Sequence, residues 1–264
     1  MGKLTDLESA IRGIPDGALL GLGGNTLNRA PMAAVMELAR QRKSGLRLVK
    51  TAGGMDVDLL CRAGCVASVD AGFISYETEF SLCQFYRQAV QSGAVKANEH
   101  ACYTVISALR AASYGIPFMP VRGLKVSDLV AVNDYFAQVT DPFTGETLNT
   151  VKAIRPQVSV LHVQLADERG NACIDGPKYD DVLLTRASET VIVTAERIVG
   201  EDYFASSSVK ADVPHFMVSA VVHAPRGAAP CACSGAYGIQ SDTIRAFLNL
   251  PDEEAFREWL QRRL

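Results

Sequence analysis

A glycine-rich loop between a short apolar segment and a proline-led helix constrains the fold of this chain more than any other feature. Residues 18–20 are apolar and are followed by Gly21, Gly23 and Gly24. Pro31 occupies a position typical of the first turn of a helix, and apolar side chains then recur with a helical period. The pattern predicts a strand, a tight turn and a helix.

A second turn of the same kind follows the apolar segment 46–49, in the sequence 51–55. Ligands of open parallel sheets bind beyond the carboxyl ends of the strands. Glycines there allow close approach to the backbone, and helix starts favour negative charge. We therefore expect a ligand site at these two turns, the alternative being two packing turns without a ligand. The predicted substrate-binding residues are Gly23, Gly24, Asn25, Arg29, Gly53, Gly54 and Met55.

The first loop matches neither of the common nucleotide-binding motifs. Thr26 stands where a dinucleotide-binding loop has its third glycine, and no Gly-Lys-Ser/Thr sequence follows it. The side chain best suited to an anion is Arg29, because a guanidinium can pair with a carboxylate through two hydrogen bonds. We expect Arg29 to bind a free carboxylate of a substrate; the alternative is an ordinary surface arginine.

Strand-like and helical patterns alternate through the rest of the chain. Apolar segments at 66–74, 158–165, 190–194 and 218–222 predict strands, and the second of these resembles a strand covered on both faces. The alternation predicts an α/β fold with an open, largely parallel sheet and helices on both faces, as a single domain over residues 1–264. Further expectations are helices at 4–13, 80–91, 101–113, 182–188 and 252–263, a helix or turn from Glu196, and an irregular excursion over 123–150.

Composition excludes several classes of protein. The net charge is −3 with no basic block, which argues against nucleic-acid binding. No apolar run is long enough to span a membrane, and the charged first residues lack a signal-peptide core, so we expect a cytoplasmic protein. An odd number of cysteines, seven, indicates reduced thiols. Neither Cys61 with Cys65 nor Cys231 with Cys233 has the spacing of a zinc site, so no metal is expected.

Six short segments, taken together, resemble one family. They are 20–24 with 29–31, then 52–54, 115–121, 155–158, 167–171 and 221–228. In these segments the chain is similar to the A subunit of family I coenzyme A-transferases, of the glutaconate CoA-transferase type. The resemblance implies a NagB-RpiA-like fold, a CoA thioester as substrate and no tightly bound cofactor. It also implies a B-subunit partner of related fold, in a heterodimer, heterotetramer or larger complex, with the site between the two.

In such transferases the thioester is attacked by a glutamate of the B subunit. Its Ser-Glu-Asn-Gly element is not found here, so the resemblance implies that the main nucleophile lies in the partner. The family has a glutamine that polarises the thioester carbonyl, and Cys102 stands at that position in this chain. A thiol is a poor hydrogen-bond donor. Plain CoA transfer therefore has two alternatives on the same scaffold: a glutaconyl-CoA-type decarboxylase and a ring-opening acyl-CoA hydrolase.

The remaining candidates are few. Glu99 and Cys102 are the possible catalytic residues; the alternative for Glu99 is a charge that stabilises a helix start. His162 lies in an apolar strand and is predicted to be a buried, hydrogen-bonded core histidine. A non-catalytic α/β protein that binds a metabolite remains a third kind of function.

Overall fold

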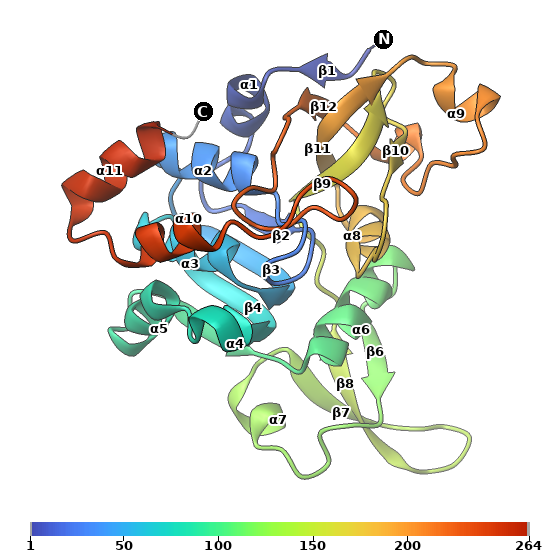
Figure 1. Cartoon of the computed structure of the whole chain (residues 1–264). Coiled ribbons are helices and arrows are strands. Elements are labelled where there is room, and N and C mark those ends of the chain that lie inside the picture. The colour runs from blue at the N-terminus through green and yellow to red at the C-terminus, as the bar shows by residue number, and fades with distance from the viewer. Residues whose placement is uncertain (1, 263–264) are drawn as a thin grey trace.

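The structure, a computed structural model, describes residues 2–262; residue 1 and the last two predicted domain residues, 263–264, lie outside this part (Figure 1). One sheet dominates, with the strand order β1-β12-β11-β9-β2-β3-β4-β5. These strands are parallel, and β10 adds to β9 in the antiparallel sense. The strands are β1 Leu4–Thr5, β2 Leu19–Leu22, β3 Leu46–Gly53, β4 Val66–Ile74, β5 Lys96–Glu99, β9 Val158–Asp167, β10 Ala172–Cys173, β11 Thr190–Val199 and β12 Ala220–His223.

Helices cover both faces of this sheet, which confirms the predicted fold class. The first face carries α1 Leu7–Arg12, α2 Met32–Arg40, α3 Met55–Arg62, α5 Gln84–Gln91, α10 Ser241–Leu248 and α11 Glu253–Gln261. The second face carries α6 Cys102–Ser113 and α8 Asp181–Ala187. Central strand β9 is buried between the two layers along almost its whole length, because it is apolar on both faces.

The excursion predicted as irregular contains a second, antiparallel sheet with the order β6-β8-β7. It projects from the main body below α6 (Figure 1). Its core is small, with Val121, Phe136 and Val151 buried against the same cluster as α6. These short strands were not predicted, because the many turn residues around them interrupt the alternation of apolar and polar side chains that marks a strand. The elements are β6 Phe118–Val121, α7 Leu129–Val132, β7 Phe136–Thr140 and β8 Thr147–Lys152.

Three local predictions were wrong. The predicted helix 4–13 begins only at Leu7, because residues 4–5 pair with β12 as a strand. The chain continues as strand β11 past Glu196, where a helix or turn was expected, since pairing with β9 extends to Val199. The helix predicted over 80–91 is divided by Ser81, whose φ is 65°. The short elements are α4 Glu77–Phe80, α9 Tyr203–Ser206 and a 3₁₀ turn His215–Met217.

Candidate active site

The two glycine turns lie side by side at the carboxyl edge of β2 and β3. The amide of Thr26 donates to the carbonyl of Ala52 over 2.9 Å. Lys50, near the end of β3, is buried and donates to the carbonyls of Gly23 and Gly24, the second at 3.0 Å. Its ammonium also lies 3.1 Å from the carboxylate of Asp56 in α3. The buried ammonium of Lys50 therefore holds both loops in place. The sequence analysis missed Lys50 because it lies within a mostly apolar strand.

The Arg29 side chain is buried within the chain and does not project into the space beyond the sheet edge. The side chain is 2% exposed and its guanidinium forms an ion pair with Asp181, at the start of α8. It also donates to the carbonyls of His162 and Pro177, each at 3.0 Å. With these partners the guanidinium is already occupied by the chain's own acceptors. Arg29 therefore acts as a buried support of the loop.

The glycines of both turns make room for other parts of this chain. A Cβ on Gly23 would lie 2.3 Å from a carboxylate oxygen of Asp181 and 2.5 Å from the Leu161 side chain. A Cβ on Gly24, whose φ is +73°, would lie 2.4 Å from the carbonyl oxygen of Arg29. A Cβ on Gly53 would lie 2.7 Å from the side chains of Ile74 and Val57, whereas one on Gly54 would lie 3.3 Å from the nearest backbone atoms. The atoms that lie close to these glycines belong to the protein itself.

The other two predicted binding residues differ in exposure. Met55 is fully buried at the first position of α3, so it contributes to packing. Asn25 is half-buried and precedes a tight reversal, in which its amide donates to the carbonyl of Asn28 at 2.9 Å. Asn28 is exposed, so the tip of this loop is the part that can contact another molecule.

Cys102 is the first residue of α6 and is partly exposed at this edge. Its thiol donates to the carbonyl of Thr51, 3.5 Å away, and the Thr51 hydroxyl donates to the carboxylate of Asp180. The helix start reaches β4 because Gly72 has no side chain: a Cβ there would lie 2.2 Å from the Cys102 amide nitrogen. Gly72 was not singled out in the sequence, since an isolated glycine in a strand has no distinctive pattern.

Burial raises the pKa of two ionisable groups beside α6. Burial raises the pKa of the Asp180 carboxyl, against the hydrogen bond from Thr51 that lowers it. Burial also raises the pKa of the Cys102 thiol. A protonated thiol is a weak nucleophile, because the thiolate is the reactive form. The arrangement is suited to hydrogen-bond donation more than to covalent attack.

Glu99 lies at the exposed end of edge strand β5, and its carbonyl accepts from the side chain of Asn133 at 2.6 Å. Next to it, His100 points inward, where its ring lies 3.3 Å from the carboxylate of Asp70. The structure therefore separates the two neighbours: Glu99 faces the solvent and His100 packs in the interior. Of the two catalytic candidates, Cys102 is the one that contacts the second glycine turn, through Thr51.

Large apolar side chains are exposed on the connections around this edge. Phe73 is 43% exposed at the end of β4, and Leu82 is 54% exposed between α4 and α5. Tyr103 follows Cys102 in α6, and Tyr179 precedes α8; each is 42% exposed. They come from connections that follow three different strands. Exposed apolar side chains around a functional edge are typical of a contact surface.

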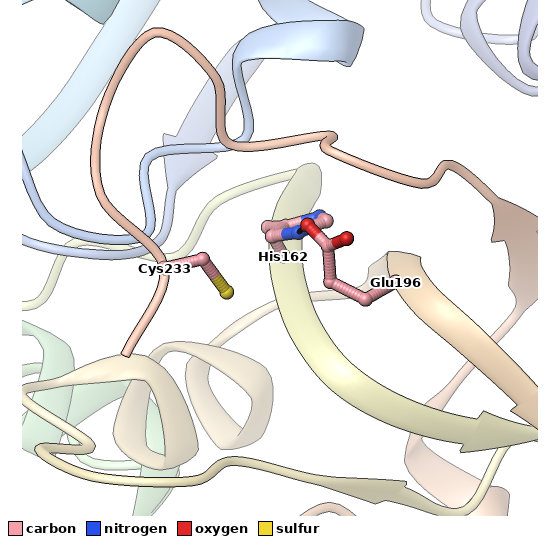
Figure 2. A group of neighbouring side chains, drawn as sticks. All are labelled: His162, Glu196 and Cys233. Carbon is pink, nitrogen blue, oxygen red and sulfur yellow. Dashed lines mark hydrogen bonds and ion pairs between the residues drawn. The ribbon is translucent and has the colours of Figure 1, made fainter. Parts of the chain in front are cut away.

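A separate polar cluster surrounds His162 in β9 (Figure 2). The imidazole is fully buried, 2.9 Å from the hydroxyl of Thr194 and 2.8 Å from the carboxylate of Glu196, both in β11. The hydroxyl of Tyr237 also donates to Glu196. These contacts confirm the predicted buried, hydrogen-bonded histidine. Cys233 approaches it from the loop that follows β12.

No helix within residues 2–262 is long and apolar enough to cross a lipid bilayer.

Several known proteins have sequences similar to this chain over most of its length. An uncharacterized protein of Archaeoglobus fulgidus is 32% identical over 98% of this chain, which spans 59% of that protein's length. The A subunit of 3-oxoadipate CoA-transferase from Pseudomonas knackmussii is 32% identical over 98% of this chain and 93% of its own. The cholesterol ring-cleaving hydrolase IpdA subunit of Mycobacterium tuberculosis is 33% identical over 89% and 84%.

Solved structures give the same picture. A variant of the decarboxylase AibA/AibB superposes with a TM-score of 0.90 and 34% identity, over 99% of this chain and 98% of the other. Glutaconate coenzyme A-transferase from Acidaminococcus fermentans gives a TM-score of 0.91 and 27% identity, over 98% and 88%. The model of the family described as coenzyme A transferase matches residues 4–224. The resemblance drawn from the sequence is confirmed, and the chain belongs to the coenzyme A transferase family.

Proposed function

We propose that this chain is the A subunit of a two-subunit enzyme that processes short, dicarboxylic acyl-CoA thioesters, and that the principal nucleophile belongs to a B subunit. The observation that carries the proposal is the position of Cys102. Its partly exposed side chain begins α6 at the carboxyl edge of the sheet, resting on Thr51. The relatives that are named as A subunits support a partner of this kind.

The proposed chemistry places the thioester carbonyl over the first turn of α6. Unpaired amide groups and the dipole of a helix start favour the negative charge that develops on that oxygen during attack. A glutamate of the B subunit would attack this carbonyl and expel CoA thiolate, leaving a mixed anhydride. The thiolate would then attack the glutamyl carbonyl, forming the enzyme's thioester with CoA and releasing the acyl group as its carboxylate, as the resemblance to family I transferases implies. The apolar rim that includes Phe73 and Tyr103 would exclude water and pack against the B subunit.

Decarboxylation is the second candidate, and two observations favour it. Cys102 stands where a transferase of this type has a glutamine, and its pKa is raised by burial, so it supplies only a weak donor. Asp180 is a partly buried carboxyl with a raised pKa, and it accepts a hydrogen bond from Thr51. In its protonated form this carboxyl would return a proton to the carbanion left by loss of CO2. The hydrolase alternative rests on the similarity to IpdA alone.

Co-expression with a candidate B subunit tests the proposal. The purified complex is incubated with glutaconyl-CoA and acetate, and acetyl-CoA, CO2 and free CoA are measured in parallel. Acetyl-CoA indicates transfer, CO2 indicates decarboxylation, and free CoA without CO2 indicates hydrolysis of the thioester; ring-opening hydrolysis leaves the thioester intact and is tested in parallel with a cyclic acyl-CoA. Cys102→Gln should shift the product ratio toward acetyl-CoA, because it introduces the stronger amide donor.

The chain alone serves as the control and is expected to show little turnover. Turnover by the isolated chain at the rate of the complex would contradict the division of the site between two subunits. A complex that binds acyl-CoA and forms none of the three products would instead support the non-catalytic, metabolite-binding alternative.

A further inference from the structure

Three potential metal ligands from distant parts of the chain converge outside the proposed active site. His162 comes from β9, Glu196 from β11 and Cys233 from the loop that follows β12 (Figure 2). One ligand atom from each lies within 4.8 Å of the other two. Within residues 2–262 no other group of three or more histidine, cysteine or acidic side chains has this geometry. The sequence alone predicted no metal, because only folding brings these residues together.

The hydrogen bonds of His162 orient its ring as metal-binding imidazoles are oriented. The hydroxyl of Thr194 donates its single hydrogen to the carbonyl of Leu161 at 3.1 Å. With its hydrogen on Leu161, the hydroxyl accepts from the Nδ1–H of His162, 2.9 Å away; this is the tautomer that a metal would select. A ring whose Nδ1–H is held by an acceptor presents the lone pair of Nε2 to a metal, and such partners are typical around bound ions.

That lone pair faces an acceptor. Nε2 of His162 lies 2.8 Å from Oε1 of Glu196. Oε2 of the same carboxylate accepts from the amide of Arg226 at 2.7 Å, and Oε1 also accepts from Tyr237. With the ring hydrogen on Nδ1, two lone pairs face each other at this distance and need a positive charge between them, either a proton or a metal ion; with the hydrogen on Nε2, the ring donates to Glu196 directly. Tyr237 and the amide of Arg226 hold the carboxylate in place for either one.

The third ligand selects the class of metal. Cys233 is fully buried, so its sulfur lies in a dry environment beside the other two groups. A thiolate, an imidazole and a carboxylate together suit zinc and similar transition-metal ions, whereas calcium and magnesium prefer oxygen ligands. In a tetrahedral zinc site the nitrogen and oxygen ligand atoms are about 3.3 Å apart. His162 and Glu196 would need to separate by only about 0.5 Å from their present distance.

The cluster also has an entrance. The side chain of Glu196 is 15% exposed, whereas that of His162 is fully covered. Glu196 borders a cavity of about 560 Å³, whose wall includes Gln164, Asp175 and Gly235. An ion can enter from this side, and a water molecule in the cavity can occupy a fourth coordination position. The amide of Gln164 donates to the carbonyl of Ser234 at 2.9 Å and so holds the cysteine loop against β9.

We propose that His162, Glu196 and Cys233 form a binding site for a divalent transition-metal ion of the zinc type. The ion takes three protein ligands and a water on the cavity side. Binding displaces the thiol proton and the proton between His162 and Glu196 into the solvent. The metal joins β9, β11 and the loop after β12, so its role is to stabilise the fold beneath the carboxyl edge.

Metal binding by the full chain tests this site. After removal of metals with a chelator, Zn²⁺ is titrated calorimetrically and Co²⁺ is followed by absorption. The expected result is one ion per chain and a thiolate-to-cobalt charge-transfer band in the near ultraviolet. Zn²⁺ at about 100 times its Kd should raise the Tm by about 5 °C.

Cys231 offers a matched control for Cys233, since both are buried thiols in the same loop. Cys233→Ser should remove the cobalt band and weaken Zn²⁺ binding at least tenfold, and Cys231→Ser should leave both unchanged. Thr194→Val should weaken binding by about tenfold or more, because it removes the partner of the His162 Nδ1–H.

Wild-type protein without a charge-transfer band on addition of Co²⁺ would overturn the proposal, whatever the variants do. Equal loss of binding in the two cysteine variants would also overturn it. Circular dichroism and the Tm of each metal-free variant confirm that the compared proteins are folded.

Discussion

The guanidinium of Arg29 and the carboxylate of Asp181 form a buried ion pair beneath the first glycine loop. Asp181 also accepts from the amide of Gly24 at 2.7 Å, and Arg29 itself has a left-handed backbone with φ of 55°. The pair thus joins the loop after β2 to the start of α8. Its two charges compensate each other in the interior, and removal of one leaves the other buried without a partner.

Arg29→Ala is therefore expected to act on stability. The expected loss is about 3–5 kcal/mol in the free energy of unfolding, typical of breaking a buried pair. Urea denaturation of the variant measures it. Arg12→Ala is the control, because Arg12 pairs with Glu8 on the surface and its loss should cost at most about 0.5 kcal/mol. Selective loss of activity on dicarboxylic acyl-CoA, with unchanged stability, would restore the substrate-binding role predicted from the sequence.

Gly23→Ala is expected to destabilise the chain by about 1–3 kcal/mol or more, because the new methyl group collides with Asp181 and Leu161. The measurement is the Tm of the variant, which should be lower than that of the wild type. Gly200→Ala is the matched control, since a Cβ there meets no atom within 4 Å. Similar melting temperatures for both variants would contradict the packing role of Gly23.

Cys102→Ser should keep kcat/KM of the assembled enzyme within about tenfold of wild type, because the hydroxyl can replace the thiol as donor to Thr51. The raised pKa of the thiol argues against a thiolate nucleophile near neutral pH. Cys173→Ser, at the other half-buried cysteine, is the control for general effects of the replacement. A loss of a thousandfold or more in Cys102→Ser alone would identify Cys102 as the nucleophile.

Asp58 should make stability fall as the pH rises. Burial raises its pKa from 3.8 to about 6, against hydrogen bonds from the amide of Tyr86 and the hydroxyl of Tyr76. Between these two values the folded chain keeps a proton that the unfolded chain has released, so stability decreases across this window and is constant above it. A shift of this size corresponds to a loss on the order of 3 kcal/mol.

Asp58→Asn should remove that dependence, since the amide has no proton to release. The difference in unfolding free energy between variant and wild type, measured in urea from about pH 4 to about pH 7, should change by on the order of 3 kcal/mol in favour of the variant. Asp242→Asn is the control, because the Asp242 side chain is fully exposed. Parallel pH profiles for Asp58→Asn and wild type would show that Asp58 is ionised in the folded chain throughout.

Local sequence predicted the main architecture. Apolar segments such as 158–165 contain enough buried side chains to specify a strand wherever they pack, and Pro31 and the glycines mark turns through their own backbone preferences. These local features predict the α/β class, the largely parallel sheet and the position of both glycine turns at the carboxyl ends of strands. They did not predict the three-stranded sheet of β6, β7 and β8, because its short strands are stabilised by pairing with one another and by packing against α6.

Tertiary structure decided what the polar residues do. Arg29 was predicted to bind a substrate carboxylate because it lies between a loop and a helix start. In the folded chain its guanidinium pairs with Asp181, 152 residues away in the sequence. The spacing of Cys233 from other cysteines in the sequence is not that of a metal site. Folding nevertheless places this loop residue beside His162 of β9 and Glu196 of β11. Backbone preference acts between neighbours in the sequence, whereas charge pairing and metal coordination act between neighbours in space. For this reason the sequence by itself determined the scaffold, and only the folded chain determined the partners of its buried charges.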